Sequence, residues 1–375
     1  MKIIRSCYDR SRGPSSIIAL LCLALTGHAA ALKTENVFLI ISDGFRWQEV
    51  FTGAEEALMT AENGVKDRPA LRARYWRETP EGRRQALLPF IWTEIALHGQ
   101  LLGNQSKGSV VVVTNGKKFS YPGYNEIITG APDPRIDSNG KHPNPNVSVF
   151  EWLNARAEFR GKVDILGTWD VFPYIFNIAR SQLPIWPAWE PQFARYEIHP
   201  PAYVTALMRD TTPGWEDLTY DSFLAHAAED CLKKRHPRVA FFGFGETDEW
   251  AHAGRYDNYL DSAHRVDDFV RRLWSEAQAM PQYRGKTTII LTADHGRGSG
   301  PVDWKSHGET TAGSEGDWIA VLGPDTPPLG ERSDLETHTQ SQIAATIAAL
   351  LGQDYQKAFP NAGAPIKDLI RGANP

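Results

Sequence analysis

The chain has 375 residues, of which 42% are hydrophobic, and its formal net charge is −5. This length allows one large α/β domain or two ordinary domains. The modest acidic charge excludes a polybasic nucleic-acid binder and a charge-driven disordered chain. No apolar run reaches the roughly 18 residues of a membrane-spanning helix. Three cysteines exclude a disulfide scaffold, and the sequence leaves the oligomeric state open.

The first thirty residues have the three-part pattern of a secretory signal peptide. Four cations precede an apolar run over 17–25, and small residues follow around Ala30. We therefore expect residues 1–30 to be removed and the protein to be exported, either to the periplasm or to the medium. An uncleaved anchor is the competing interpretation, but the apolar run is too short to span a bilayer. Cleavage changes the net charge from −5 to −8 and leaves Cys231 as the only cysteine.

Residues 31–375 alternate between strand and helix patterns. Short β-branched apolar runs with the length of buried parallel strands occupy 37–41, 110–114, 163–167, 239–244, 287–291 and 319–322. Apolar residues at helical spacing occupy 85–97, 147–157, 223–234, 256–279 and 340–351. This alternation predicts one α/β domain with a mostly parallel central sheet and helices on both faces. In such sheets ligands bind beyond the carboxyl ends of the strands, so the chemistry is expected there.

Two stretches interrupt the alternation. Residues 53–84 are charged and loop-like, and residues 170–216 combine three tryptophans with a cluster of prolines. One interpretation of the second stretch is a surface excursion that packs its own aromatic side chains. The other is a loop-rich cap at 170–216 that covers the strand ends and shapes a substrate pocket. The aromatics of this region either stack on a substrate or pack the core: Trp169, Tyr174, Trp186 and Trp189.

Acidic and imidazole side chains follow three of the predicted strands. Asp43 comes directly after 37–41, Asp248 and His252 follow 239–244, and the pair Asp294-His295 follows 287–291. The spacing of Asp248 and His252 puts both on one face of a helical turn. Carboxylate oxygens and imidazole nitrogens suit zinc or a similar divalent ion. Each motif alone is ordinary turn or capping chemistry, but together they reach one edge of the predicted sheet.

A nucleophile candidate follows the predicted strand 110–114. Ser120 stands at the expected N-terminus of a helix, where backbone N–H groups and the helix dipole attract phosphoryl oxygens. The same position also suits a serine that only caps the helix. A serine needs a base or a metal to become a good nucleophile, and a nearby metal centre would supply that reason. His307 precedes the last strand as a further ligand candidate, with His338 in reserve.

These residues resemble the alkaline phosphatase superfamily, and within it the type I phosphodiesterase/nucleotide pyrophosphatase branch. The resemblance rests on the ordered series Asp43, Ser120, Asp248-x-x-x-His252, Asp294-His295 and His307, and it extends from residue 36 to the final helix. It implies an alkaline phosphatase-like fold and two divalent metal ions, with zinc preferred and manganese as the alternative. One metal would be held by Asp43, Ser120, Asp294 and His295, and the other by Asp248, His252 and His307.

The sequence after Ser120 departs from the family pattern. The phosphodiesterase branch follows its nucleophile with Phe-Pro-Asn-His, whereas this chain has Tyr121-Pro122-Gly123-Tyr124. The asparagine that helps to hold the phosphoryl group is therefore absent at 123, and Asn125 is the candidate replacement. Sulfatases need an arginine where this chain has Tyr124, which argues against sulfatase chemistry.

Together with the predicted signal peptide, the resemblance therefore implies an exported, metal-dependent hydrolase of a small-molecule phosphate ester, either a monoester or a diester, that acts through a phosphoseryl intermediate on Ser120. Two other functions stay open. One is a phosphotransferase similar to the cofactor-independent phosphoglycerate mutases, which export disfavours. The other is a secreted, metal-stabilised binding module without turnover. Four cations near the motifs could meet substrate, although a solvated surface position is more typical of such residues: Lys117, Lys118, Arg297 and Lys305.

Overall fold

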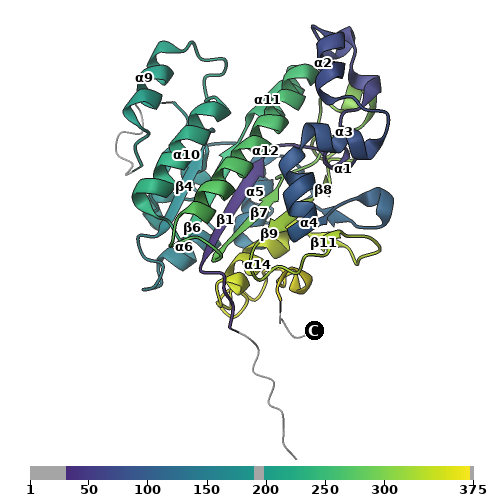
Figure 1. Cartoon of the computed structure of the whole chain (residues 1–375). Helices are drawn as coiled ribbons and strands as arrows, with labels where there is room; N and C mark the ends of the chain where they lie inside the picture. Colours follow the sequence, from purple (N-terminus) through teal and green to yellow (C-terminus); the bar gives the residue numbers. More distant parts are fainter. Residues whose placement is uncertain (1–30, 190–197, 372–375) are drawn as a thin grey trace, which may run out of the picture. The chain divides into compact units, whose positions relative to one another are not determined.

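The computed structural model describes residues 31–189 and 198–371, so the predicted signal peptide lies outside the described residues. Its main sheet has eight strands in the order β10-β2-β9-β7-β1-β6-β4-β5 (Figure 1). The parallel set is β7 (Thr287–Thr292), β1 (Asn36–Ser42), β6 (Val239–Phe244), β4 (Val163–Gly167) and β5 (Ile185–Pro187). β9 (Ile319–Leu322) runs antiparallel to both β7 and β2 (Gln100–Leu102), and β10 (Gly330–Glu331) is parallel to β2. The predicted α/β fold with a mostly parallel sheet is thus confirmed.

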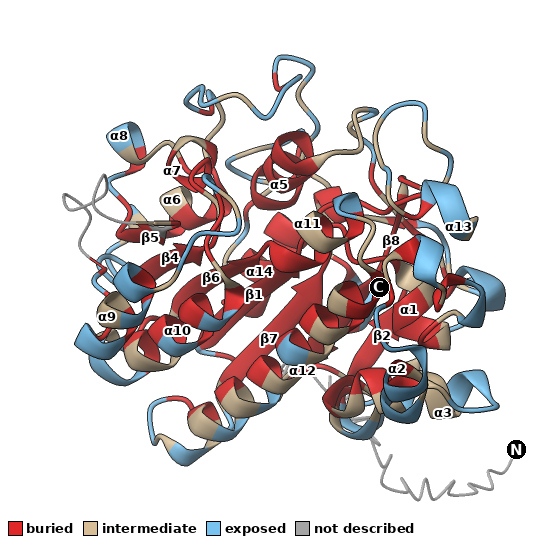
Figure 2. Ribbon diagram, turned by 90° about the horizontal axis from the view of Figure 1, so that it is seen from above, coloured by how far each residue is buried: buried red, intermediate tan, exposed pale blue. Residues whose placement is uncertain are grey.

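Helices cover both faces of this sheet because alternate strand residues point to opposite sides. In β1, Phe38 and Ile40 belong to one hydrophobic cluster, and Val37, Leu39 and Ile41 belong to the other. The first cluster includes residues of α10 (Asp221–Arg235) and α12 (Tyr256–Ala279), and the second includes α5 (Ser120–Thr129), α6 (Val149–Asn154) and α14 (Ile343–Leu350). Figure 2 shows α10 and α12 on one side of the strands and α5 and α6 on the other.

Two predicted elements differ from the structure. The run 110–114 contributes only β3 (Val111–Val112), which joins β8 (Gly316–Asp317) and β11 (His338–Thr339) in a separate small sheet. The single helix expected over 85–97 is broken, because Pro89 cannot donate a backbone hydrogen bond. α3 (Pro80–Leu87) ends before this proline, and a π-helical turn, η3 (Ile91–Ile95), and α4 (Ala96–His98) follow it.

The stretch 53–84, which the sequence indicates to be loop-like, also holds short helices. Asp67 caps α2 (Arg68–Tyr75) through Ala70 N at 2.9 Å, and Thr79 caps α3 through Gly82 N at 3.1 Å. A proline lies in the first turn of each helix, where its missing N–H costs nothing. The other short elements before β3 are α1 (Trp47–Thr52), η1 (Glu56–Leu58), η2 (Ala61–Asn63) and η4 (Gln105–Lys107).

The segment 170–216 begins with α7 (Phe172–Ile175) and α8 (Ile178–Ser181), continues into β5 and later forms α9 (Ala202–Asp210). Part of this segment therefore belongs to the central sheet, since β5 is its edge strand. Trp186 on β5 is buried in the core. The remaining short helices are α11 (Glu246–His252), α13 (Gly300–Asp303), η5 (Gln340–Gln342) and η6 (Lys367–Leu369).

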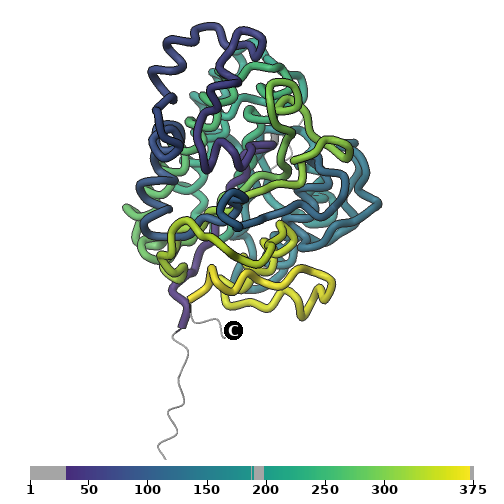
Figure 3. Tube along the Cα trace, turned by 90° about the vertical axis from the view of Figure 1, so that its right-hand side faces the viewer, coloured from purple at the N-terminus to yellow at the C-terminus, as the bar shows by residue number. Residues whose placement is uncertain are grey.

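The two ends of the described domain meet beside Asp325. Lys33 N and Thr34 N donate to Asp325 Oδ2 at 2.8 and 2.6 Å, and Arg371 N donates to the Asp325 carbonyl at 2.6 Å. Figure 3 shows the start of β1 and the yellow C-terminal segment at the same end of the domain. β1 runs away from this end, so its carboxyl end lies on the far side. Among the described residues, no helix is both long and apolar enough to cross a bilayer.

Two paired glycines let an aromatic ring pack directly on the sheet. Gly167 of β4 is the register partner of Gly243 of β6. A Cβ at Gly167 would lie 2.2 Å from Phe172 Cδ2, and a Cβ at Gly243 would lie 2.5 Å from Phe172 Cζ. The Phe172 ring also meets Tyr124 of α5 edge-on, with a centroid distance of 5.0 Å. The glycines therefore fix how closely α7 and α5 approach the sheet.

We expect Gly243→Ala to lower the free energy of unfolding by about 1–3 kcal/mol, because the added methyl group would overlap the Phe172 ring. Denaturant unfolding measures the change. The same substitution in a Phe172→Leu background should cost less, because the overlapping ring atoms are gone. An equal cost in both backgrounds would contradict this account of the packing.

Candidate functional site

The candidate active site lies where three neighbouring parallel strands end. β1 lies between β7 and β6, and Asp43, Asp294 and Asp248 follow these strands in the chain. All three carboxylates are buried. The ligand atoms of Asp43, Asp294 and His295 lie within 4.8 Å of one another, and those of Asp248, His295 and His307 form a second such group. The structure therefore brings these predicted ligands together at one edge of the sheet.

His295 is the member common to both groups. Its Nε2 atom lies 3.4 Å from Asp43 Oδ1, 3.6 Å from Asp294 Oδ2 and 3.9 Å from Asp248 Oδ1. Its Nδ1 atom lies 2.9 Å from the Gly296 carbonyl oxygen. A proton on Nδ1 satisfies that carbonyl, which leaves the Nε2 lone pair directed toward the carboxylates. His295 thus presents a ligand nitrogen in the middle of the site.

His252 and His307 complete the second group. α11 carries Asp248 and His252 one turn apart, and His252 Nε2 lies 3.1 Å from Asp248 Oδ2. The Nε2 atoms of His252 and His307 are 2.9 Å apart, and His307 Nε2 is 3.7 Å from Asp248 Oδ1. His307 Nδ1 lies 3.2 Å from the Lys118 carbonyl oxygen, so this ring is also oriented from behind. Two imidazoles and one carboxylate converge as zinc ligands do.

Ser120 lies at the first position of α5, beside the first group. Its Oγ atom is 3.5 Å from His295 Nε2. α5 approaches the site closely because residue 123 is glycine: a Cβ there would lie 2.2 Å from the Asp294 carbonyl oxygen. An asparagine at 123, as in the family pattern, would collide with this carbonyl. Tyr124, one residue on, donates its hydroxyl to Asp43 Oδ2 at 2.9 Å.

A cleft of about 340 Å³ opens onto these residues. It is lined by Asp43, Ser120, Asp248, His252 and His307 of the two groups, together with Asn139, Lys141, Trp169, Asp170, Val171, Asp217, Leu218, Gly245 and Glu249. The cleft is thus large enough for a small organic phosphate ester, and the nucleophile candidate and four of the metal-ligand candidates line it.

The buried carboxylates of the site favour a bound metal cation. Burial and the neighbouring Asp248 carboxylate raise the pKa of Asp43 to about 7. Burial and the Asp43 carboxylate raise the pKa of Asp294 well above its ordinary value. Burial lowers the pKa of His295 to about 4, so this imidazole is neutral and able to act as a ligand. Without a cation, several buried acids repel one another around a neutral ring.

Two buried carboxylate oxygens in the site have no hydrogen-bond partner, and their positions indicate whether a metal fits. Asp43 Oδ1 and Asp294 Oδ2 are buried and have no hydrogen-bond partner. Their second oxygens are engaged, by the Tyr124 hydroxyl at 2.9 Å and by Gly44 N at 3.0 Å. The two free oxygens lie close to the free nitrogen of His295. A buried acceptor without a donor is costly, and a divalent cation removes that cost, so the residues fit a metal.

Two predicted residues lie away from this centre. The Asn125 amide is buried and engaged elsewhere: Oδ1 accepts from Asn144 and Asn146, both at 3.1 Å, and Nδ2 donates to the Ala131 carbonyl at 3.2 Å. It does not line the cleft. His338, the reserve ligand, lies on β11 with Nδ1 3.3 Å from Gln342 Oε1, and neither ligand group includes it.

Sequence reasoning missed Asn139. This residue lines the cleft from the loop after α5, and its Oδ1 accepts from the backbone N–H of Tyr121 at 3.0 Å. The Tyr121 N–H, which lies next to Ser120, is therefore occupied. The Asn139 Nδ2 group is the donor that remains. No local sequence pattern marks this asparagine, because its position depends on how the loop folds back onto α5.

Arg297 is buried, whereas a solvated position is the interpretation its sequence context favours. Its Nη1 atom pairs with Asp248 Oδ1, and Nε and Nη2 donate to the carbonyls of Trp304 and Lys305 at 3.0 and 2.6 Å. Burial alone would raise the pKa of Asp248, but Arg297 and the adjacent imidazoles hold it well below its ordinary value. Arg297 thus keeps Asp248 ionised and oriented.

One buried carboxylate organises the loop that leads to Ser120. Glu126 of α5 accepts hydrogen bonds at 2.5–3.1 Å from the backbone and side chains of Thr114 and Asn115 and from the side chains of Gln340 and Ser341. Glu126 itself is fully buried. Charge-assisted bonds of this number fix the loop against the helix that carries the nucleophile candidate.

The same network extends to His307. Asn115 Oδ1 accepts from Lys117 N at 2.9 Å and Lys118 N at 2.8 Å, which holds Lys118 at a left-handed φ of 55°. The carbonyl of Lys118 then faces His307 Nδ1. A chain of hydrogen bonds therefore connects Glu126 to a metal-ligand candidate of the second group.

Glu126→Gln should lower the free energy of unfolding by about 1–3 kcal/mol, because an amide cannot accept from all of these donors and leaves some of them buried and unpaired. Denaturant unfolding of the purified chain measures this loss. Glu315→Gln is the matched control. Glu315 contacts Lys118 from the solvent side with 45% of its side chain exposed, so its loss should cost well under about 1 kcal/mol. Equal costs would contradict the role assigned to Glu126.

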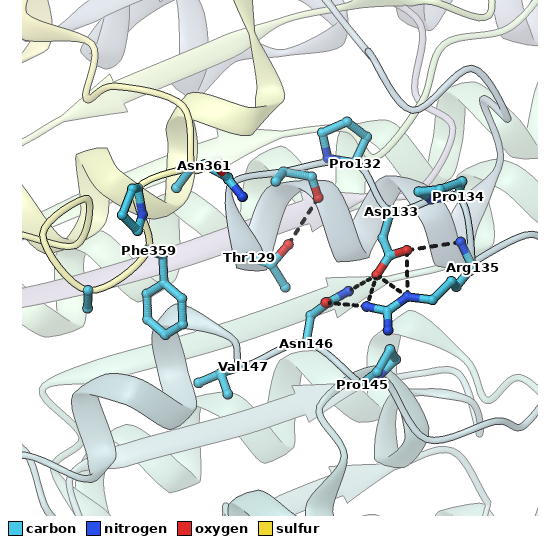
Figure 4. A pocket seen from close by; sticks show the side chains of 14 residues that line it. Thr129, Pro132, Asp133, Pro134, Arg135, Pro145, Asn146, Val147, Phe359 and Asn361 are labelled. Atoms are coloured by element: carbon cyan, nitrogen blue, oxygen red, sulfur yellow. Dashed lines mark hydrogen bonds and ion pairs between the residues drawn. The ribbon is translucent and has the colours of Figure 1, made fainter.

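A larger cavity, of about 540 Å³, lies at the other end of α5 and is lined by residues of 129–135, 145–147 and 358–362 (Figure 4). Several of its polar side chains are already hydrogen-bonded. Asp133 Oδ2 accepts from Arg135 Nη2 at 2.6 Å and from Asn146 Nδ2 at 2.7 Å, and Thr129 Oγ1 donates to the Ala131 carbonyl at 3.1 Å. It contains none of the predicted site residues, so its size does not make it the active site.

Comparison with known protein families agrees with this geometry. The family described as type I phosphodiesterase / nucleotide pyrophosphatase matches residues 69–354. The chain therefore belongs to this family. The match includes Ser120 and the ligand candidates from Asp248 to His307, while Asp43 precedes it. The predicted resemblance is confirmed, and so is the prediction of an enzyme that hydrolyses phosphoric esters. A comparison with curated protein sequences found no match.

Solved structures share the fold. Wild-type alkaline phosphatase PafA has a TM-score of 0.57 at 11% identity, with 90% of this chain and 99% of that chain covered. The phosphonate monoester hydrolase of Agrobacterium radiobacter has a TM-score of 0.54 at 15% identity, with 91% and 78% covered. The lipoteichoic acid synthase LtaP from Listeria monocytogenes has a TM-score of 0.55 at 11% identity, with 92% and 76% covered. The predicted alkaline phosphatase-like fold is confirmed.

Proposed function

We propose that the protein is an exported, metal-dependent hydrolase that cleaves a small-molecule phosphate ester through a phosphoseryl intermediate on Ser120. The observation that carries this proposal is the position of Ser120, at the start of α5 with its hydroxyl 3.5 Å from His295 and open to the cleft. Residues 1–30 would act as the signal peptide and residues 31–375 as one catalytic domain with a cap within 170–216.

The chain's own groups account for binding and attack. The Oγ–P bond would form as the P–O bond to the organic group breaks, and that group would leave as an alcohol with the proton lost by the serine. Water would then break the Oγ–P bond, restoring the serine hydroxyl and releasing phosphate from a monoester or a phosphate monoester from a diester. The Asn139 amide would donate to a phosphoryl oxygen in place of the asparagine absent at 123. Lys141 also lines the cleft, where its Nζ lies 2.5 Å from Asp170 Oδ2.

Asp43, Ser120, Asp294 and His295 would hold one divalent cation, and Asp248, His252 and His307 the other, with zinc preferred and manganese as the alternative. Bound cations would supply positive charge that lowers the pKa of the serine hydroxyl and offsets the charge on the phosphoryl group. The protein's part is to keep the ligands converged, through Glu126 behind the loop and Arg297 behind Asp248.

Ser120→Ala should lower kcat for an aryl phosphate or aryl phosphodiester by at least about a thousandfold, because no other described hydroxyl is expected to replace the attacking oxygen. The release of p-nitrophenolate measures the rate. Thr129→Ala, on the same helix and outside the cleft, is the matched control and should keep the parent rate within about threefold. Retained turnover in Ser120→Ala would exclude the phosphoseryl pathway.

Removal of metal should lower stability as well as activity. Dialysis against a chelator leaves the orphaned oxygens of Asp43 and Asp294 unpaired, so the melting temperature should fall by several degrees and return when zinc is added. Elemental analysis should find about two metal ions per chain, and about one in Asp294→Asn. A chain that is equally stable and equally active after dialysis would contradict the metal assignment.

A further inference from the structure

One part of the cleft wall carries chemistry that the proposed hydrolysis does not use. Trp169 and Asp170 follow β4, and β4 is the neighbour of β6 in the sheet. They therefore reach the same sheet edge as the metal-ligand candidates, one strand further along. Asp217, from a segment more than forty residues later, lines the cleft beside them.

Backbone pairing fixes this wall. Thr219 N donates to the Thr168 carbonyl at 2.8 Å, and Asp170 N donates to the Asp217 carbonyl at 2.9 Å, with an antiparallel bridge between Trp169 and Leu218. The Trp169 indole N–H donates to Asp217 Oδ2 at 3.3 Å. The indole is only partly buried and lines the cleft, with the Asp217 carboxylate at its N–H edge.

The acidic side chains in this part of the lining outnumber the basic ones, so its net charge is negative. Lys141 is the one lysine or arginine in the described lining, and its Nζ lies 2.5 Å from Asp170 Oδ2. Asp170 is 4% exposed, and its Oδ1 is buried without a hydrogen-bond partner. Asp217 and Glu249 add two more acidic side chains to the same lining. An anionic second group on the substrate, such as a further phosphate, would be repelled here.

We propose that this wall, Trp169, Asp170 and Asp217, binds a cationic amine carried by the organic group of the phosphoester. This inference rests on the proposed hydrolase function and names the class of its substrate. An ammonium group gains from an aromatic face and from adjacent carboxylates, and a quaternary ammonium needs no hydrogen-bond donor of its own. The phosphoryl end would lie at Ser120 and the cationic end at the end of β4.

The test compares two isosteric substrates with the metal-loaded mature chain. p-Nitrophenyl phosphorylcholine carries a quaternary nitrogen, and p-nitrophenyl 3,3-dimethylbutyl phosphate has a neutral carbon at that position. The monoester pair, phosphocholine and 3,3-dimethylbutyl phosphate, is assayed by phosphate release. For whichever pair is hydrolysed, we expect kcat/KM of the charged substrate to exceed that of the neutral substrate by about tenfold or more. The difference should arise chiefly from a lower KM for the charged substrate.

Substitutions of the wall should reduce this preference. Trp169→Ala and Asp217→Asn should each bring the charged-to-neutral ratio of kcat/KM below about threefold. Glu336→Gln, the same loss of charge at an exposed residue outside the cleft, should keep the parent ratio. A ratio near one in the parent chain, or a preference that survives both substitutions, would overturn the proposal.

Two further outcomes distinguish failure of the cation-binding subsite from failure of the proposed hydrolase function. A strong preference for the p-nitrophenyl ester of thymidine 5′-monophosphate over the choline ester would identify Trp169 as a nucleoside platform and overturn the cationic subsite. If no ester is hydrolysed, the proposed function fails. Calorimetry then decides the subsite alone: phosphocholine should bind about tenfold more tightly than 3,3-dimethylbutyl phosphate, and equal affinities would overturn it.

Discussion

The structure depends on holding three buried carboxylates close together. Asp43, Asp248 and Asp294 come from three adjacent strands, and their charges repel in a region that water does not screen. Arg297 offsets the charge of Asp248. The Tyr124 hydroxyl donates to one oxygen of Asp43, and the Gly44 N–H donates to one oxygen of Asp294. The oxygens left without hydrogen-bond partners are those that face His295, so the unpaired acceptors of Asp43 and Asp294 lie close to one point in the site.

The sheet and α5 make this arrangement rigid. A parallel sheet delivers its strand ends to one edge, and α5 brings Ser120 to the same edge because Gly123 permits contact with the Asp294 backbone. Glu126 then fixes the loop before Ser120 and, through the backbone of Lys118, the ring of His307. Nucleophile and ligand positions are therefore coupled through the protein itself, which is what a site for phosphoryl transfer requires.

The sequence predicts the parts of this structure that follow from local pattern. The apolar spacing over 256–279, for example, predicts α12 with the bounds that the structure has. A short buried strand followed by an acid is visible without a structure, so Asp43, Asp248 and Asp294 could be identified. Arg297 and Asn139 could not, since their roles depend on which distant backbone they meet. Asn125 shows the opposite failure: it lies near Ser120 in the chain, but a helix turns its amide toward Asn144 and Asn146.

The cleft divides its charge along the sheet edge. The metal-ligand candidates lie at the ends of β7, β1 and β6, where Asp43 and Asp294 each have one oxygen without a hydrogen-bond partner. This part of the cleft would bind an anion once metal cations are held there. Near the end of β4 lie Asp170 and Asp217, and among the described lining residues Lys141 is the one lysine or arginine that offsets their charge. A substrate that is anionic at one end and cationic at the other matches both parts in a single orientation. Orientation is worth as much to a hydrolase as affinity, because only one end of the substrate reaches Ser120.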